Sequence, residues 1–412
     1  MKSLKKSQDL REDNMNIPFI DLKEQYSLIH KQVRKAVDKV LEHGAYVMGP
    51  EISQLENRLA ELCGQKHALG CSSGTDALIL ALLALDIKPG DAVLTSPFTF
   101  FATAEAIAFL GAVPVFVDID PATFNINPAE LSRALKALTQ PEISNFPLPR
   151  PGAISGLGHA TPDRTSAKAV ISVDLFGLPC EYDQISKLAE QEKLKLIVDA
   201  AQSFGARYKG KSTCALGNAA CTSFFPAKPL GCYGDGGMCF TDDDDIIELL
   251  KSFRVHGQGK DRYDNTRLGM NARMDTIQAA ILLVKMDIFT QELTMREKVA
   301  ARYNTLFAQS RNDVITPAVF EHATSAWAQY SILARDQEHR EKIFRRLKSR
   351  NIPWAVYYPL PLHLQQAFSY LGYKHGDFPV SEEISKRIFS LPMHPYITQE
   401  DQQTIVNAVL SA

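Results

Sequence analysis

Short apolar segments alternate with amphipathic ones through the first 250 residues of the chain. Two amphipathic stretches, 22–41 and 52–63, carry apolar side chains at helical spacing and predict helices. The segments that follow predict strands at 92–95, 113–117, 169–176, 194–198, 222–225 and 238–241, and helices at 77–85, 102–110 and 181–192. Short buried strands that alternate with helices indicate a mostly parallel α/β sheet, in which ligands gather at the carboxyl ends of the strands.

The pattern is interrupted by residues 139–167, which carry five prolines and three glycines and no periodicity. We expect a long surface insert there. After Asp275 a helix is predicted to about residue 293, followed by mixed elements of a smaller α+β domain. The predicted organisation is therefore a disordered extension at 1–14, a large α/β domain at 15–255, and an interface helix with a small domain at 256–412.

Composition narrows the class of protein. The 412 residues include 45 Lys and Arg against 47 Asp and Glu, and this balance argues against a nucleic-acid partner. No apolar run approaches the roughly 20 residues of a membrane span, and the first residues lack the apolar core of a signal peptide. The seven cysteines show no metal-site spacing, so we expect free thiols, no metal, and a cytoplasmic location.

Three polar features stand where a buried sheet would place a ligand. Ser73, Gly74 and Thr75 directly precede an apolar helix, whose free N–H groups and dipole favour a phosphate. Asp199 ends a predicted strand, and Lys228 follows one among apolar residues, where desolvation would make its amine nucleophilic. Each feature alone has an ordinary structural explanation: a helix cap, a loop salt bridge, or a surface lysine that buries only its stem.

Taken together, an anion site, an acid and a reactive lysine match the needs of pyridoxal 5′-phosphate. Phe100, after the strand 92–95, is the candidate to cover the cofactor ring, with simple core packing as the alternative. The glycine-rich segment 231–237 lacks the spacing and the following helix of a dinucleotide loop, which disfavours a nicotinamide oxidoreductase.

The ordered motifs resemble those of the DegT/DnrJ/EryC1/StrS family of pyridoxal-phosphate sugar aminotransferases. The resemblance runs from about residue 17 to the C-terminus, and it rests on segments 19–22, 49–51, 73–78, 198–203, 223–228 and 231–237. It implies the fold-type I architecture, which is like that of aspartate aminotransferase, and a homodimer with shared active sites.

The resemblance also implies a role for each matching residue. Lys228 would form the Schiff base with the cofactor and then move the proton, and Asp199 would keep the ring nitrogen protonated. The other implied cofactor contacts are Gln202 near the phenolic oxygen, Gly74, Thr75 and Ser223 at the phosphate, and Asn271 reaching the phosphate from the partner subunit.

Segment 269–275 is similar to the form found in members that aminate C3 of a nucleotide-linked keto sugar. The implied reaction moves an amino group from L-glutamate to a 3-keto sugar, with UDP-2-acetamido-3-oxo-glucuronate of bacterial surface-polysaccharide (O-antigen) synthesis as the expected substrate. Arg273 is expected either to hold the sugar carboxylate by a bidentate pair or to form a structural ion pair, and Tyr358 and His363 are further candidate substrate contacts.

Two alternatives stay open. One is amination at C3 or C4 of a UDP- or dTDP-linked 6-deoxy keto sugar, and the other is a non-catalytic regulator on the same fold. The sequence also departs from the family pattern at Asp174, where many members have histidine, at Ala272 and Met274, and in the long insert, which could be inert or could cover part of the nucleotide site.

Overall fold

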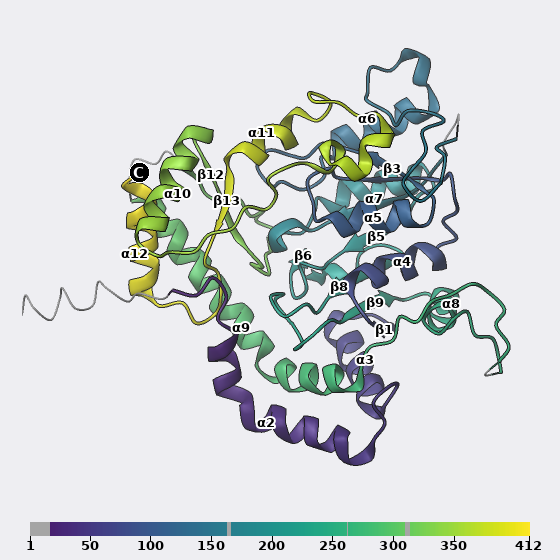
Figure 1. Cartoon of the computed structure of the whole chain (residues 1–412), viewed down its shortest axis with the longest axis horizontal. Coiled ribbons are helices and arrows are strands. Elements are labelled where there is room, and N and C mark those ends of the chain that lie inside the picture. Colours follow the sequence, from purple (N-terminus) through teal and green to yellow (C-terminus); the bar gives the residue numbers. More distant parts are fainter. Residues whose placement is uncertain (1–16, 163–165, 262, 310–313) are drawn as a thin grey trace, which may run out of the picture.

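A seven-stranded sheet in the order β1-β9-β8-β5-β4-β2-β3 forms the middle of the larger part of the molecule, on the right in Figure 1. This computed structural model describes residues 17–162, 166–261, 263–309 and 314–412, so the predicted extension at 1–14 lies outside the described residues. The strands are β1 His67–Cys71, β2 Ala92–Thr95, β3 Val113–Phe116, β4 Ala167–Val173, β5 Lys195–Asp199, β8 Ala219–Ser223 and β9 Gly237–Thr241. Five of them, from β3 to β8, are parallel, and β9 is antiparallel to both β8 and β1. The predicted mostly parallel α/β sheet is confirmed.

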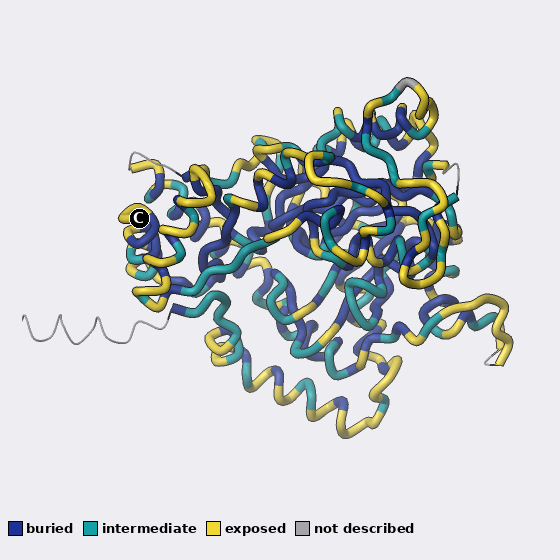
Figure 2. Tube along the Cα trace, turned by 45° about the horizontal axis from the view of Figure 1, so that its top comes forward, coloured by how far each residue is buried: buried dark blue, intermediate teal, exposed yellow. Residues whose placement is uncertain are grey.

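Helices cover both faces of this sheet, because successive strand residues point to opposite sides. On β5, Leu196 and Val198 join the core beneath α3, α6 and α7, whereas Ile197 joins the core beneath α4 and α8. Figure 2 shows the strands buried between these layers. The helices are α2 Leu22–His43, α3 Pro50–Cys63, α4 Gly74–Ala84, α5 Phe101–Phe109, α6 Pro128–Thr139, α7 Tyr182–Gln191, α8 Asp244–Arg254 and α9 Thr276–Ala308. Within the described ranges, no helix combines the length and the apolar character needed to cross a membrane.

Several predicted boundaries are wrong, and α9 is the largest case. It extends to Ala308, far beyond the predicted end near residue 293. Its first turns bury Ala279 and Leu282 against the large sheet, whereas its last turns bury Val299 and Phe307 in a separate core. Because the buried face serves two different cores, no single apolar stripe runs the length of the helix and marks its end in the sequence.

A second layered unit follows in the chain, built on the three-stranded sheet β10-β12-β13. Its core also contains Ile17 and the end of α9, so the first described residues pack with the last part of the chain. A small sheet, β11-β6-β7, lies apart from both. The elements are β6 Arg207–Tyr208, β7 Lys211–Ser212, β10 Val314–Ile315, β11 Ala323–Thr324, β12 Tyr330–Ala334, β13 Ile388–Leu391, α10 Gln337–Ser349, α11 Pro379–Arg387 and α12 Gln399–Leu410. The division between residues 255 and 256 stays a prediction.

The insert at 139–167 runs to the amino-terminal edge of the sheet. Its described part forms a bridge between Ile154 and Ala160, and His159 packs beside Gly111, directly before β3. Pro162 lies beside Gly90, before β2. The tip of the insert is therefore at the opposite edge of the sheet from the carboxyl ends of β2 and β3.

Candidate active site

The carboxyl ends of β4, β5 and β8 open onto a cavity of about 710 Å³. Segments that are far apart in the sequence meet there because neighbouring parallel strands end at one edge of the sheet. The predicted site residues that line the cavity are Gly74, Thr75, Phe100, Asp199, Gln202, Ser223, Lys228 and Tyr358. No residue of the insert lines it, so in the described part of this chain the insert does not cover the cavity.

The first turn of α4 forms an anion-binding cradle at one end of the cavity. Ser73 is the N-cap, and its Oγ accepts a hydrogen bond from Asp76 N at 3.0 Å. The amides of Gly74 and Thr75 follow at the start of the helix, where N–H groups have no intrahelical acceptor. A Cβ on Gly74 would lie 2.7 Å from Ser223 Cβ, so only glycine brings this turn so close to β8. The cradle therefore offers N–H donors and the positive end of a helix to a phosphate.

Asp199 is a buried carboxylate at the end of β5. Its Oδ2 accepts from Thr103 Oγ1 at 2.8 Å, and its Oδ1 accepts from Ala201 N at 3.2 Å. Burial raises the pKa of Asp199, and the two hydrogen bonds and the charge of Lys228 oppose that shift. Such a carboxylate is suited to face a cationic ring nitrogen. The positive charge would stabilise the buried carboxylate in place of the hydration that it has lost.

Lys228 enters the cavity from the loop that follows β8. Its backbone N donates to Phe225 O at 2.8 Å, which turns the loop tightly after the strand. Burial lowers the pKa of Lys228, and the charge of Asp199 opposes the shift. A lysine with lowered proton affinity keeps a larger fraction of its amine free for attack on a carbonyl carbon.

Gln202 is held in one orientation on the wall of the cavity. Its Oε1 accepts from Phe176 N at 2.7 Å, and its Nε2 donates to Tyr358 Oη at 3.2 Å. Phe100 stands at the mouth with 57% of its side chain exposed, and its ring centroid lies 6.4 Å from that of Tyr358. An exposed aromatic ring at the mouth is compatible with the predicted cover over a flat cofactor.

Three predicted site residues do not line this cavity. Asn271 and Arg273 lie elsewhere on the surface, where Arg273 Nε donates to Asn271 Oδ1 at 2.7 Å. His363 is 1% exposed, and its Nε2 lies 3.0 Å from Glu382 Oε1. One ring nitrogen of His363 is thus engaged within the fold, and its role as a substrate contact stays a prediction.

Sequence reasoning missed Thr103, the hydrogen-bond donor to Asp199. Thr103 is a polar residue on the otherwise apolar buried face of α5, and this was the available signal, because a buried hydroxyl needs a partner. Asp174, named above as a departure from the family pattern, accepts from Cys180 N, Tyr182 Oη and Ser203 Oγ, and burial raises its pKa to about 6. Asp174 is therefore a structural acceptor that holds the segment after β4.

The residues present fit pyridoxal phosphate. The cavity combines a cradle that a side chain at Gly74 would fill, a buried carboxylate that lacks a full counter-charge, and an amine of lowered proton affinity. Each matches one part of that cofactor: phosphate, ring nitrogen and aldehyde. The described residues contain no group of His, Cys, Asp and Glu side chains that could hold a metal ion.

Comparison with known proteins agrees with this site. The sequence profile of the DegT/DnrJ/EryC1/StrS aminotransferase family matches residues 27–410. A curated relative from Pseudomonas aeruginosa, UDP-2-acetamido-2-deoxy-3-oxo-D-glucuronate aminotransferase, is 42% identical over 92% of this chain and 96% of its own. Another, from Geobacillus stearothermophilus, is named a pleiotropic regulatory protein and is 40% identical over 96% and 98% of the two chains.

A solved structure shows the same fold. The aminotransferase of this family from Brucella abortus is 42% identical and superposes with a TM-score of 0.86 over 96% of this chain and 99% of that one. The chain belongs to the DegT/DnrJ/EryC1/StrS aminotransferase family, and it is a sugar aminotransferase that uses pyridoxal 5′-phosphate.

Proposed function

We propose that this enzyme transfers the amino group of L-glutamate to C3 of UDP-2-acetamido-3-oxo-glucuronate, in the synthesis of a bacterial surface polysaccharide such as O-antigen. The meeting of Lys228, Asp199 and the α4 cradle in one cavity carries the chemistry. The likeness to the Pseudomonas aeruginosa enzyme over nearly the whole chain supports the choice of sugar and position.

The residues of the cavity divide the work. Bound pyridoxal phosphate supplies an aldehyde that takes up the amino group and a ring that accepts electron density. The N–H groups of Gly74 and Thr75 and the Ser223 hydroxyl hold the phosphate, and the Asp199 carboxylate stabilises positive charge on the ring nitrogen. Lys228 would hold the aldehyde carbon in the resting enzyme, and its amine would be the group that removes the α-proton of glutamate and delivers a proton to C3 of the sugar.

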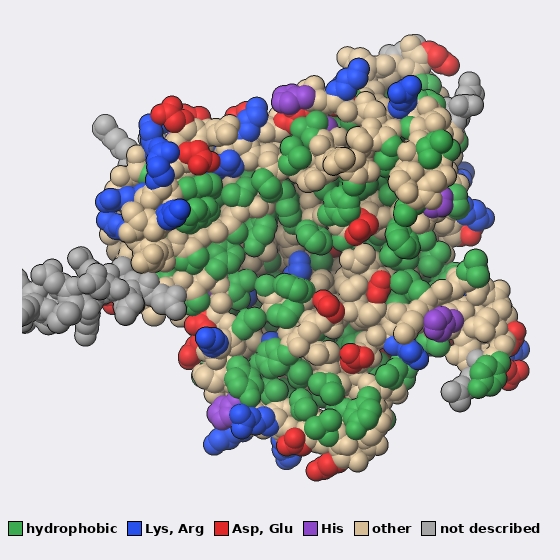
Figure 3. All heavy atoms as spheres, in the orientation of Figure 1, with side chains coloured by type: hydrophobic (Ala, Val, Ile, Leu, Met, Phe, Trp, Pro, Cys, Tyr) green, Lys and Arg blue, Asp and Glu red, His purple; other side chains and the backbone are tan. Residues whose placement is uncertain are grey.

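We further propose that two copies of the chain share each active site. Among the described residues that line the cavity, Lys228 is the one cation. The proposed sugar nucleotide, however, carries the negative charges of a diphosphate and of a carboxylate. Asn271 and Arg273 of a partner subunit would supply donors that the cavity lacks. Exposed apolar side chains on and after α2, namely Leu28, Leu41, Tyr46, Val47 and Met48, support a subunit interface, and Figure 3 shows hydrophobic side chains gathered in that region.

The seven cysteines are all free and buried, which supports a reducing, cytoplasmic setting. The Geobacillus stearothermophilus relative is named a pleiotropic regulatory protein, but a non-catalytic role does not fit this chain. The presence of both Lys228 and Asp199 in the cavity favours the enzyme.

The substrate is tested by offering the purified enzyme glutamate and a panel of UDP- and dTDP-linked 3-keto and 4-keto sugars. We expect mass spectrometry to show that the UDP-linked 3-keto uronate gains the amine, and that glutamate alone converts the bound cofactor to its amine form. Preferred amination of a 6-deoxy sugar would reject the uronate. Failure of glutamate to convert the cofactor would point to another amino donor.

Arg273 is tested on the preferred sugar. Its Nε is occupied by Asn271, but the outer guanidinium nitrogens can still form two parallel bonds to a carboxylate. We expect Arg273→Ala to lower kcat/KM for the uronate roughly 10- to 100-fold, as for the loss of hydrogen bonds to a charged group, and to leave a neutral 3-keto sugar much less affected. Equal losses on both sugars would assign Arg273 to the structure or to the orientation of Asn271.

A further inference from the structure

Lys285 is a buried cation outside the cavity, on the face of α9 that packs against the large sheet. The residue is 1% exposed, and within the described part of the chain no salt bridge to it is found. Its Nζ donates to Gly231 O at 2.6 Å and lies 4.1 Å from the centroid of the Tyr233 ring. Burying an ammonium group is costly, and here the cost is offset by one carbonyl, one aromatic face and the charge of Glu292, which forms no salt bridge with Lys285. A residue that only filled space at this position would not need a charge.

The carbonyl that Lys285 binds belongs to the loop that carries Lys228. This loop closes on itself, since Cys232 N donates to Phe224 O at 2.8 Å. Gly231 is packed so tightly that a Cβ there would lie 2.6 Å from Pro226 O. A hydrogen bond to Gly231 O therefore fixes the side of the loop that faces away from the cavity.

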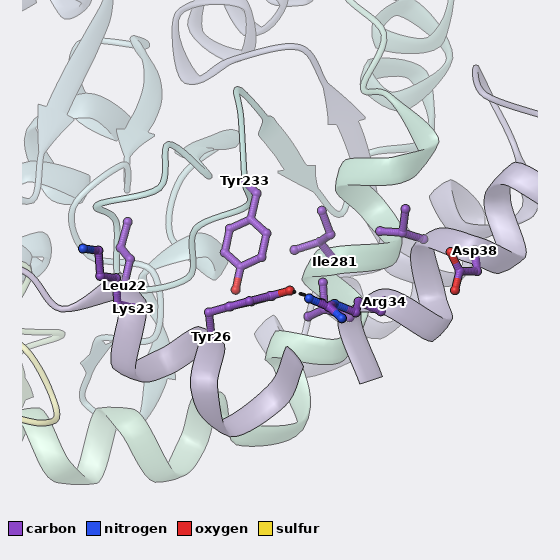
Figure 4. A pocket seen from close by; sticks show the side chains of 9 residues that line it. Leu22, Lys23, Tyr26, Arg34, Asp38, Tyr233 and Ile281 are labelled. Carbon is purple, nitrogen blue, oxygen red and sulfur yellow. Dashed lines mark hydrogen bonds between the residues drawn. The ribbon is translucent and has the colours of Figure 1, made fainter. Parts of the chain in front are cut away.

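α9 holds the next residues as well. Gln278 Oε1 accepts from Tyr233 N at 2.9 Å, one residue beyond the Gly231–Cys232 peptide. The Tyr233 ring meets Tyr26 of α2 edge-on, with centroids 6.0 Å apart, and Figure 4 shows Tyr233 pointing toward Tyr26 beside Ile281 of α9. The loop after Lys228 is thus clamped between α9 and α2 at consecutive points.

We propose that Lys285 is a positioning residue, whose buried ammonium group holds the Gly231 carbonyl and the Tyr233 ring so that the Lys228 amine keeps one reactive position. The proposal rests on the proposed role of Lys228. In this proposal Lys285 does not touch the substrate. It supports the proton transfer only by keeping Lys228 in place.

The charge state of Lys285 should make the activity of the enzyme depend on pH. Burial lowers the pKa of Lys285 to about 8, and Glu292 on α9 and Cys232 on the loop oppose the shift. Tyr233 on the loop faces Nζ, and Tyr26 of α2 lies behind that ring. Lys285 therefore stays protonated below about pH 8 and loses its proton, and with it its charge, above that value. The clamp weakens as the pH rises through this range.

The test compares Lys285→Met and Lys285→Arg with Lys298→Met, a change of an exposed lysine on the same helix. We expect Lys285→Met to lower kcat about 10- to 100-fold, as for a misplaced reacting group, with little change in KM for glutamate and with Lys298→Met unaffected. We expect Lys285→Arg to recover much of the rate at neutral pH and to move the alkaline fall of kcat upward, since a guanidinium group stays protonated. The pH at which the visible absorbance of the bound cofactor changes should shift in the Met variant as well.

Unchanged kcat and an unchanged absorbance titration in a folded Lys285→Met variant would overturn the proposal. Should that variant fail to fold, an alkaline limb of kcat in the same place in Lys285→Arg as in the native enzyme would overturn it instead. Borohydride reduction and peptide mapping of the native enzyme test Lys228 separately. Cofactor found on another residue would reject the proposed role of Lys228, whatever the Lys285 variants show.

Discussion

Replacing Lys228 with alanine is expected to abolish transamination. The change removes both the nucleophile for the cofactor aldehyde and the base that moves the proton, so kcat should fall by about 10⁴-fold or more. The visible absorbance of the lysine-bound cofactor should disappear, while the α4 cradle still binds the phosphate. The measurements are the rate of 2-oxoglutarate release from glutamate and the absorbance spectrum of the purified protein.

Lys228→Arg is the matched control for this change. It keeps a positive charge opposite Asp199 but offers no usable amine, because the guanidinium group stays protonated in proteins. We expect it to be as inactive as the alanine variant and to retain more cofactor. Turnover within about tenfold of the native rate in either variant would show that another group performs the proton transfer.

The parts of the site that the sequence revealed share one property: each is a local pattern. Gly74 and Thr75 could be predicted because they belong to a short run of small and polar residues before an apolar helix. Asp199 could be predicted because it ends an apolar strand. Lys228 was recognisable from its apolar neighbours. The parallel sheet then brings these local features together, since its strands end at one edge.

The parts that the sequence did not reveal depend on contacts between distant segments. β1 was missed as a strand, and it joins the sheet only through β9, some 170 residues later. Thr103 matters because α5 places it against β5, and Lys285 because α9 crosses behind the loop after β8. A polar residue in an apolar helix is a visible signal, but its partner is set by packing that no local pattern encodes.

Asp199 gives the second large effect. Asp199→Asn keeps the shape of the side chain, and the hydroxyl of Thr103 and the amide N–H of Ala201 can both still find partners in the asparagine side chain. It removes the negative charge that would stabilise a protonated ring nitrogen, so we expect kcat to fall by about 10²- to 10³-fold, as for the loss of one preorganised electrostatic contact. The affinity for the cofactor should fall as well, measured by absorbance or fluorescence titration.

Stability should move in the opposite direction, and this separates a functional from a structural role for Asp199. Burial raises the pKa of Asp199 above its unfolded value, so the ionised carboxylate makes the folded, cofactor-free chain less stable as the pH rises through the folded pKa. The cofactor-free Asp199→Asn variant should therefore melt at the same temperature as the native chain or higher at neutral pH. Thr103→Val, which removes one hydrogen bond and keeps the charge, should cost activity about tenfold or less. A folded Asp199→Asn variant with kcat near the native value would show that the ring does not depend on this charge.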